Sequence, residues 1–302
     1  MNSLTFKYLL LIIGLIGTHC RPSTESEESE ESSNEIDDDD ETPDQVPHND
    51  KETEGELVEG DILSSGGVFR NANVQPKMWP GGEVFYEKPR TTTFSSGVID
   101  NITQAMADIT AASGNCIVFK ERTIRTGKRN YIQIKKDRGC FSKVGMVGGP
   151  QPLSLGLGCY KKGVIIHEFL HALGVNHEHT RHDRDQHIEV KKNNVLSLDV
   201  YNNNFKKRII HDDYGIPYCY MSIMHYSNTA FSKSDNDKTI IPLINPSLKL
   251  GQRVKLDSCD IKLLKEMYKC TPGKGSGIPK EDSSDDSYSS YSSYSLYKKP
   301  GT

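Results

Sequence analysis

The sequence predicts an α+β domain, and three observations support that prediction. From Phe94 onward apolar residues recur at helical spacing, which gives a helix with one buried face formed by Val98, Ile102, Ala105, Met106 and Ile109. Two short segments rich in β-forming residues follow, 116–119 and 131–134, and the second alternates cleanly between apolar and polar residues. A second helix is expected around His167. An early helix with strands, then another helix, is typical of α+β folds.

A last amphipathic helix is expected before Cys270. Its apolar face is formed by Ile261, Leu264, Met267 and Tyr268, and either Asp257 or Ser258 can cap its N-terminus. Beyond it, glycines and Ser/Tyr repeats make residues 271–302 a low-complexity tail that we expect to be disordered. A mean hydropathy of -0.59 over 302 residues agrees with a chain that is partly unfolded.

The first 20 residues resemble a cleaved signal peptide. Lys7 precedes an apolar run, 8–16, that is too short to cross a bilayer, and small or polar residues follow up to Cys20. A membrane anchor is the alternative, but the polar stretch from Arg21 begins before a span of about 20 residues is complete. The sequence therefore predicts a secreted, extracellular protein without a membrane anchor.

Two segments of opposite charge follow. Residues 22–61 contain 18 acidic residues and one basic residue, a net charge of -17, whereas residues 71–270 contain 19 acidic and 29 basic residues, a net charge of +10. The acidic segment has few apolar residues, so we expect it to be disordered, and it contains no loop with the ligand spacing of an EF-hand calcium site. The basic segment contains no recognisable nucleic-acid module, which favours acidic protein or glycan partners over nucleic acid.

A metal-binding pattern lies in the middle of the chain. Residues 164–177 read Val-Ile-Ile-His-Glu-Phe-Leu-His-Ala-Leu-Gly-Val-Asn-His. His167 and His171 are four residues apart and share one helix face, so both imidazoles can reach a single ion. Gly174 allows a positive φ that ends the helix and returns His177 toward the other two histidines. Glu168 lies beside this site, where it can act as a general base on a water molecule.

Three histidines leave one position of a tetrahedral zinc ion open, which is typical of a catalytic site. A structural zinc is the alternative, but such sites usually have four protein ligands, often thiolates, and no cysteine lies near this helix.

Four further histidines lie in charged, loop-like sequence and are expected at the surface: His179, His182, His187 and His211.

Two motifs resemble those of the astacin family, within the metzincin class of zinc peptidases. Residues 177–185 match the family's extension of the zinc motif, and residues 222–226, Ser-Ile-Met-His-Tyr, resemble its Met-turn. The resemblance implies a two-lobed catalytic domain over 71–270 with a zinc cleft and one Zn²⁺. It also implies that Met224 lies beneath the metal, and that Tyr226 is a displaceable ligand that turns to stabilise the oxyanion.

Residues 58–61, Val-Glu-Gly-Asp, resemble the family's pro-segment motif, with Val58 in place of the usual Phe. The resemblance implies that Asp61 is the zymogen's zinc ligand and excludes the nucleophilic water. We expect an acidic propeptide over 21–70, removed by an activating protease that cuts after Arg70. Asn71 then becomes the amino terminus, which in astacins is buried and reaches the glutamate after the third histidine, here Glu178.

Six cysteines remain after removal of the signal peptide, and six cysteines in a secreted domain imply three disulfides with 15 possible connectivities. The family pattern implies two of them, Cys116 with Cys270 and Cys140 with Cys159. Cys219 and Cys259 lie outside that pattern, and we infer that they form a third.

The sequence therefore favours a zinc endopeptidase that cleaves proteins or peptides, expected to be a monomer. The alternative is a catalytically inactive extracellular binding or matrix protein that keeps the fold. Arg253 matches the position that in the family selects Asp or Glu just after the scissile bond. A guanidinium suits this role because it can bind a carboxylate in a bidentate way. Asn101, in Asn-Ile-Thr, is the chain's N-glycosylation acceptor sequence.

Overall fold

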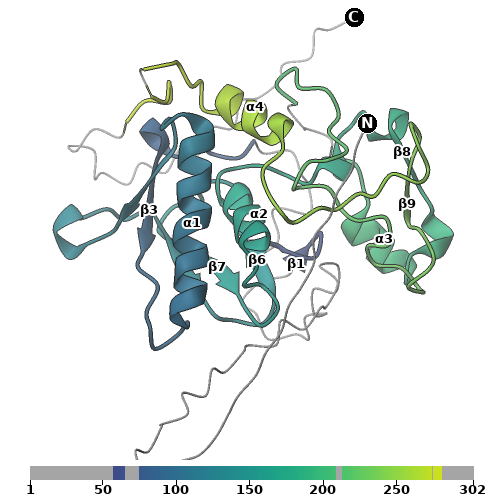
Figure 1. The fold of residues 1–302 in the computed structure, drawn as a ribbon, viewed down its shortest axis with the longest axis horizontal. Coiled ribbons are helices and arrows are strands. Elements are labelled where there is room, and N and C mark those ends of the chain that lie inside the picture. The colour runs from purple at the N-terminus through teal and green to yellow at the C-terminus, as the bar shows by residue number, and fades with distance from the viewer. Residues whose placement is uncertain (1–56, 65–74, 209–212, 274, 281–302) are drawn as a thin grey trace, which may run out of the picture. The chain divides into compact units, whose positions relative to one another are not determined.

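The computed structural model describes residues 57–64, 75–208, 213–273 and 275–280, which form an α+β domain (Figure 1). The α-helices are α1 Ser96–Ser113, α2 Lys162–Ala172, α3 Leu198–Asn204 and α4 Ser258–Met267. The strands are β1 Leu57–Val58, β2 Ile62–Leu63, β3 Glu83–Glu87, β4 Val118–Glu121, β5 Tyr131–Lys135, β6 Cys140–Ser142, β7 Pro150–Leu155, β8 Ile188–Val190 and β9 Ile240–Pro242. The described residues also contain the short 3-10 helices η1 Pro80–Gly82, η2 Ile124–Thr126, η3 Glu178–Thr180, η4 Arg184–Gln186 and η5 Lys192–Asn194.

Seven strands form one sheet in the order β1-β2-β6-β7-β5-β3-β4, and β8 and β9 form a separate antiparallel pair. Strand β3 is parallel to β4 and β5, β5 is parallel to β7, and β6 is antiparallel to β7. The first two strands come from residues 57–63, and β2 extends the sheet by pairing in parallel with β6. Residues 57–61 therefore belong to the fold, although they are part of the acidic segment that we expected to be disordered.

Helices α1 and α2 pack against each other, and both contact the sheet (Figure 1). The sequence-predicted face of α1 is confirmed, because Ile102, Ala105, Met106 and Ile109 are buried and Val98 packs partly buried against the same core. Gly114 adopts φ 72° and ends α1, a left-handed conformation that glycine reaches without a steric cost. The first predicted strand begins at Val118 rather than Cys116.

Helix α2 is buried on every side, as expected of a helix in the centre of a domain. Gly163 lies in its first turn, where a Cβ atom would collide with the backbone carbonyl of Arg253. The absence of a side chain at Gly163 therefore brings the segment around Arg253 close to the start of the helix.

The apolar core of the described residues consists of two clusters, which agrees with the two-lobed domain that the family resemblance implies. The larger cluster joins α1, α2 and the sheet to α4, and it also contains Ile223 and Met224. The smaller cluster gathers residues from β8, β9 and the chain around them, namely Ile188, Val195, Phe205, Tyr218, Tyr226, Ala230, Ile240 and Leu250.

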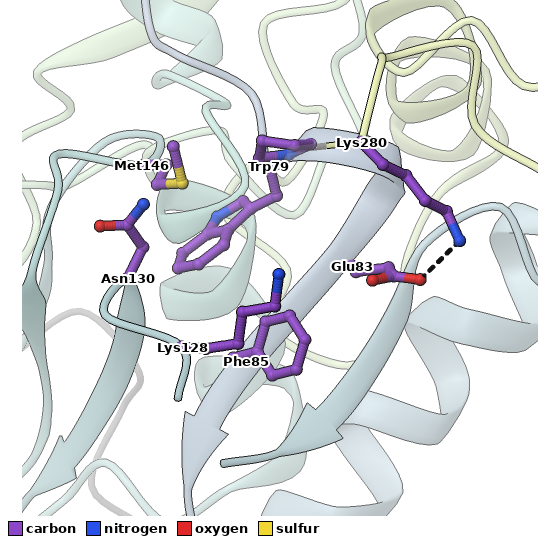
Figure 2. A pocket seen from close by; sticks show the side chains of 8 residues that line it. Trp79, Glu83, Phe85, Lys128, Asn130, Met146 and Lys280 are labelled. Carbon is purple, nitrogen blue, oxygen red and sulfur yellow. Dashed lines mark ion pairs between the residues drawn. The ribbon is translucent and has the colours of Figure 1, made fainter. Parts of the chain in front are cut away.

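Helix α4 begins at the predicted cap, where the Asp257 side chain accepts a hydrogen bond from the Cys259 amide. Packing continues past Cys270: the Gly81 amide donates to the Ile278 carbonyl at 2.9 Å, and Lys280 pairs with Glu83 at 2.9 Å. A cavity of about 170 Å³ lies beside this ion pair (Figure 2). The first residues of the expected tail are thus part of the fold, and residues 281–302 lie outside the described residues.

All three predicted disulfides are confirmed: Cys116–Cys270, Cys140–Cys159 and Cys219–Cys259. The expected signal peptide lies outside the described residues. Within the described part of the chain, no helix combines the length and apolar character needed to cross a bilayer.

The third disulfide closes a loop with a sequence separation of 40. We expect the double variant Cys219→Ser/Cys259→Ser to lose about 4 kcal/mol of unfolding free energy, because its unfolded chain is not closed into a loop and therefore has more conformational entropy. Urea unfolding followed by the fluorescence of Trp79, the chain's only tryptophan and a buried one, measures this loss. An unchanged midpoint would contradict the expectation.

Candidate metal centre

Three histidine side chains converge in the interior. His167 and His171 come from α2, and His177 follows the turn at Gly174, which adopts the predicted positive φ of 105°. The Nε2 atom of His177 lies 3.2 Å from Nε2 of His171 and 3.3 Å from Nε2 of His167. All three side chains are buried, so the helical spacing and the glycine turn place them as the sequence predicts.

The outer nitrogen of each imidazole has a hydrogen-bond acceptor. His167 Nδ1 lies 2.8 Å from the Ile223 carbonyl, His171 Nδ1 lies 2.8 Å from the Val175 carbonyl, and His177 Nδ1 lies 2.8 Å from a Glu59 carboxylate oxygen. Because each Nδ1–H donates outward, each Nε2 presents a lone pair to the same point. Three lone pairs at this spacing suit a shared cation, and an all-histidine set suits zinc.

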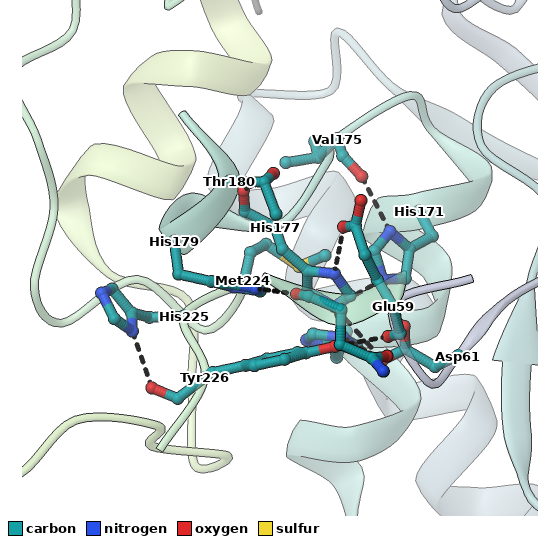
Figure 3. Close-up of polar contacts among 12 residues, drawn as sticks. Glu59, Asp61, His171, Val175, His177, His179, Thr180, Met224, His225 and Tyr226 are labelled. Carbon is teal, nitrogen blue, oxygen red and sulfur yellow. Dashed lines mark hydrogen bonds and ion pairs between the residues drawn. The ribbon is translucent and has the colours of Figure 1, made fainter. Parts of the chain in front are cut away.

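Asp61 is the fourth member of this group (Figure 3). Its Oδ2 atom lies 3.0 Å from His167 Nε2 and 3.3 Å from His177 Nε2, and Oδ1 lies 3.6 Å from His171 Nε2. Burial raises the pKa of this carboxyl, but His177 and His171 in their protonated forms outweigh burial and hold the pKa well below its ordinary value. A cation bound by the neutral imidazoles acts in the same direction. Asp61 is therefore a carboxylate that can bind the same cation as the histidines.

Glu59 was not singled out from the sequence, yet it contacts the same site. Its carboxylate bonds His177, and its backbone carbonyl accepts a hydrogen bond from the Tyr226 hydroxyl at 2.6 Å (Figure 3). The second carboxylate oxygen pairs with Arg208 at 2.8 Å. Glu59 immediately precedes Gly60 and Asp61, so its place in the acidic motif was the only available signal.

Glu168 lies in α2 beside His167 and is 1% exposed. Neither of its carboxylate oxygens has a hydrogen-bond partner among the described residues. Burial raises the pKa of Glu168 well above its ordinary value, Asp61 raises it further, and Arg253 lowers it. A buried carboxyl with no protein partner has both oxygens free for a water molecule or a cation.

The Met-turn is fixed by a buried carboxylate of α4. Asp260 accepts hydrogen bonds from the Ser222 hydroxyl at 2.6 Å and from the Ile223 amide at 3.0 Å. This places the Ile223 carbonyl against His167 and buries Met224 in the larger core. The Cys219–Cys259 disulfide joins the same two segments.

Glu178 is buried and accepts a hydrogen bond from the Cys219 amide at 2.7 Å. Burial raises the pKa of Glu178 to about 7, and Arg181 opposes that rise. Arg70 and Asn71, the predicted processing site, lie outside the described residues.

Arg253 and Asn101 have defined positions outside the histidine cluster. The Arg253 guanidinium donates to the His225 carbonyl at 3.0 Å and to the Gln252 carbonyl at 3.1 Å. Asn101 lies in α1, and its side-chain nitrogen donates to the Tyr160 carbonyl at 3.1 Å. Glycosylation of Asn101 stays a prediction.

The expectation that His179 is a surface residue is wrong. His179 is 0% exposed, its Nε2 lies 2.8 Å from the Asn204 carbonyl, and its ring stacks on Tyr226 with 3.8 Å between centroids. The charged neighbours in sequence suggested a solvated loop, but the ring of His179 turns inward and supports the tyrosine. His182 is exposed and His187 is partly buried, whereas His211 lies outside the described residues.

A helix that presents two histidines and a glutamate, a third histidine after a glycine turn, and the turn of residues 222–226, whose Ile223 carbonyl contacts His167, are the features of a zinc peptidase of the metzincin class. Residues 71–269 match the family model described as Astacin, a peptidase family. The chain belongs to the astacin family, and it is a zinc metalloendopeptidase with one zinc site.

Several relatives agree with this assignment. The chain is 37% identical over 239 residues to zinc metalloproteinase nas-4 of Caenorhabditis elegans, covering 74% of this chain and 72% of the relative. It is 38% identical over 224 residues to the low choriolytic enzyme of Oryzias latipes, covering 71% and 79%. The solved structure of high choriolytic enzyme 1, a hatching enzyme zinc-protease of the same fish, matches with a TM-score of 0.58 and 32% identity, covering 69% of this chain and 99% of that one.

The converging lone pairs predict which histidines control metal content. We expect His177→Asn to weaken zinc binding by more than about 100-fold, because removal of a ligand costs more than loss of its outer hydrogen bond. Metal analysis of the dialysed protein measures the zinc per chain. His182→Asn is the matched control. His182 is exposed, so this variant should retain one zinc. Equal zinc loss in both variants would contradict the assignment.

Proposed function

We propose that the chain is a secreted, latent precursor of an endopeptidase in which Glu168 is the general base. The observation that supports this role most directly is the buried Glu168 carboxyl, adjacent to His167, with both oxygens free of described protein partners. Glu168 accepts a proton from the attacking water and passes it to the leaving amine. Zinc held by His167, His171 and His177 supplies Lewis acidity for this reaction.

Tyr226 has the geometry of an oxyanion donor. Its hydroxyl donates to the backbone carbonyl of Glu59 at 2.6 Å, which stands in for the peptide carbonyl of a substrate. The stacked His179 and the nearby Phe205 fix the orientation of the ring. A phenol held in this position can donate to the scissile carbonyl oxygen as it gains negative charge.

Residues 57–64, here named the pro-segment, maintain latency in three ways. Asp61 lies against all three histidines, the Glu59 carbonyl binds Tyr226, and β2 covers the edge of β6. The Ser142 amide donates to the Asp61 carbonyl at 2.9 Å, so the pro-segment holds a backbone group that an extended substrate could otherwise bind. Removal of the pro-segment therefore frees the metal position, the tyrosine and a strand edge together.

Glu178 suits the role of partner for the new amino terminus. It is a buried carboxyl whose pKa is raised to about 7, so a nearby ammonium would stabilise its charged form. We infer that cleavage after Arg70 supplies that ammonium at Asn71. The same interpretation makes residues 1–20 a signal peptide and residues 21–70 a propeptide. We further infer a monomer whose three disulfides form in an oxidising compartment.

We expect Glu168→Gln to retain one zinc and the fold but to lose at least about a hundredfold in kcat, because an amide cannot accept the proton of water. Peptide hydrolysis and metal analysis on the same processed sample separate the two effects. Glu189→Gln, at an exposed position of β8, is the control that should keep full turnover. Turnover of Glu168→Gln above about a hundredth of the parent rate would count against Glu168 as the base.

Activation should yield a defined amino terminus. We expect the active form to begin at Asn71 and the full precursor to be inactive, because Asp61 blocks the metal while it remains bound. N-terminal sequencing and peptide hydrolysis over a time course of limited proteolysis test this order of events. A fully active form that begins upstream of Asp61 would be incompatible with the proposed latency.

Arg253 is proposed to select Asp or Glu just after the scissile bond. Its backbone lies against Gly163 in the first turn of α2, and its guanidinium bonds the His225 carbonyl of the Met-turn, which supports a position near the metal centre. We expect a peptide library to show an acidic preference there that Arg253→Ala removes, whereas Lys255→Ala, at an exposed position, keeps it. The part of the preference that comes from long-range charge should weaken with added salt. A preference unchanged in Arg253→Ala would disprove the role.

A further inference from the structure

Arg208 binds the pro-segment, and the proposed reaction assigns this contact no role. Its guanidinium lies 2.8 Å from Glu59 Oε1, and the two side chains are 16% and 7% exposed. The other Glu59 oxygen bonds His177, so one carboxylate joins Arg208 to a histidine of the metal centre. This is a largely desolvated, charge-assisted pair at the edge of the site.

The main chain of the domain holds Arg208 in this position. Its backbone amide donates to the Thr180 carbonyl at 2.8 Å, three residues after His177. Nearby, the Glu59 amide donates to the Asn203 carbonyl at 3.3 Å. Residues 203 and 208 therefore both contact Glu59 of the pro-segment. They belong to the domain that remains after processing.

Glu59 is the only carboxylate that pairs with Arg208 within the described ranges. The Arg208 Nε atom is buried and has no hydrogen-bond partner there. When the pro-segment leaves, the domain therefore retains the Arg208 guanidinium without its paired carboxylate, next to the place where Glu59 bonds His177 in the precursor. A guanidinium without its carboxylate can bind an incoming carboxylate through charge-assisted hydrogen bonds, and the Thr180 contact holds the Arg208 main chain in place for it.

We propose that Arg208 is a carboxylate-binding subsite of the processed domain, which takes a substrate Asp or Glu side chain in the place that Glu59 holds in the precursor. The proposal rests on the proposed removal of the pro-segment. It differs from the role of Arg253, whose guanidinium bonds the His225 and Gln252 carbonyls. The two arginines therefore act on different residues of a bound substrate.

The first test is a peptide library in which Asp, Glu, Asn or Gln occupies each position around the cut. We expect the processed parent to prefer the acid over its amide by about tenfold at one position, and Arg208→Gln to remove that preference alone. Arg253→Ala should leave that position unchanged. Lys207→Gln is the matched control, because Lys207 is an exposed neighbour of the same charge that pairs with Asp185.

The second test measures binding of a synthetic peptide of residues 57–64 to the zinc-loaded, processed protein by calorimetry. We expect Glu59→Gln in the peptide to weaken its binding to the parent protein about tenfold. The same change should weaken binding to the Arg208→Gln protein little, because this double-mutant cycle isolates the energy of the Glu59–Arg208 pair. Arg208→Lys, which keeps the charge without the planar fork, should recover part of the affinity. Zinc content reports whether each variant is folded.

Acid-to-amide ratios in Arg208→Gln that equal those of the parent at every position would overturn the subsite. An equal cost of Glu59→Gln in both proteins would overturn its pairing with the pro-segment. If the peptide fails to bind while the library shows a preference that depends on Arg208, the proposed latency fails and the substrate subsite stands.

Discussion

Three imidazole nitrogens that point their lone pairs at one another are the constraint on which the rest of this structure depends. Separations of 3.2 and 3.3 Å between the Nε2 atoms are unfavourable unless a cation lies among them and each Nδ1 donates outward. The fold meets the second condition with acceptors from three places: the Met-turn, the turn after α2 and residue Glu59. Asp260 and the Cys219–Cys259 disulfide hold the Met-turn, so α4 also serves the metal centre.

One of these acceptors is not a permanent part of the proposed mature protein. The Ile223 and Val175 carbonyls belong to the domain, whereas the Glu59 carboxylate leaves with the pro-segment. His177 must then find another acceptor for its Nδ1 proton, in water or in a bound substrate. The proposed latency and the metal geometry would thus be coupled through this single hydrogen bond. Asp61 blocks the centre directly, and Glu59 changes the environment of one of its histidines.

The sequence predicts those parts of the site that depend on local spacing. His167 and His171 follow from the helical period, His177 from the glycine turn at Gly174, and the helix cap from Asp257. Contacts between distant segments could not be predicted in this way. Glu59 and Arg208 are 149 residues apart in the sequence, and His179 is buried against a tyrosine from the distant Met-turn. Family resemblance supplied Asp61, because no periodicity links an acidic segment to a metal centre.

The opposite charges of the two segments explain how so acidic a stretch can enter a buried site. Desolvation disfavours both Glu59 and Asp61, yet both have pKa values below their ordinary range. Arg208 and the hydrogen bond from His177 offset that cost for Glu59, and positive charge at the histidines, from their protonated forms or from a bound cation, offsets it for Asp61. The acidic segment as a whole is attracted to a domain with a net charge of +10. Long-range attraction thus favours encounter, whereas two specific carboxylates fix the register at the metal. Salt screens the first effect strongly and the second weakly, because the two carboxylates are buried.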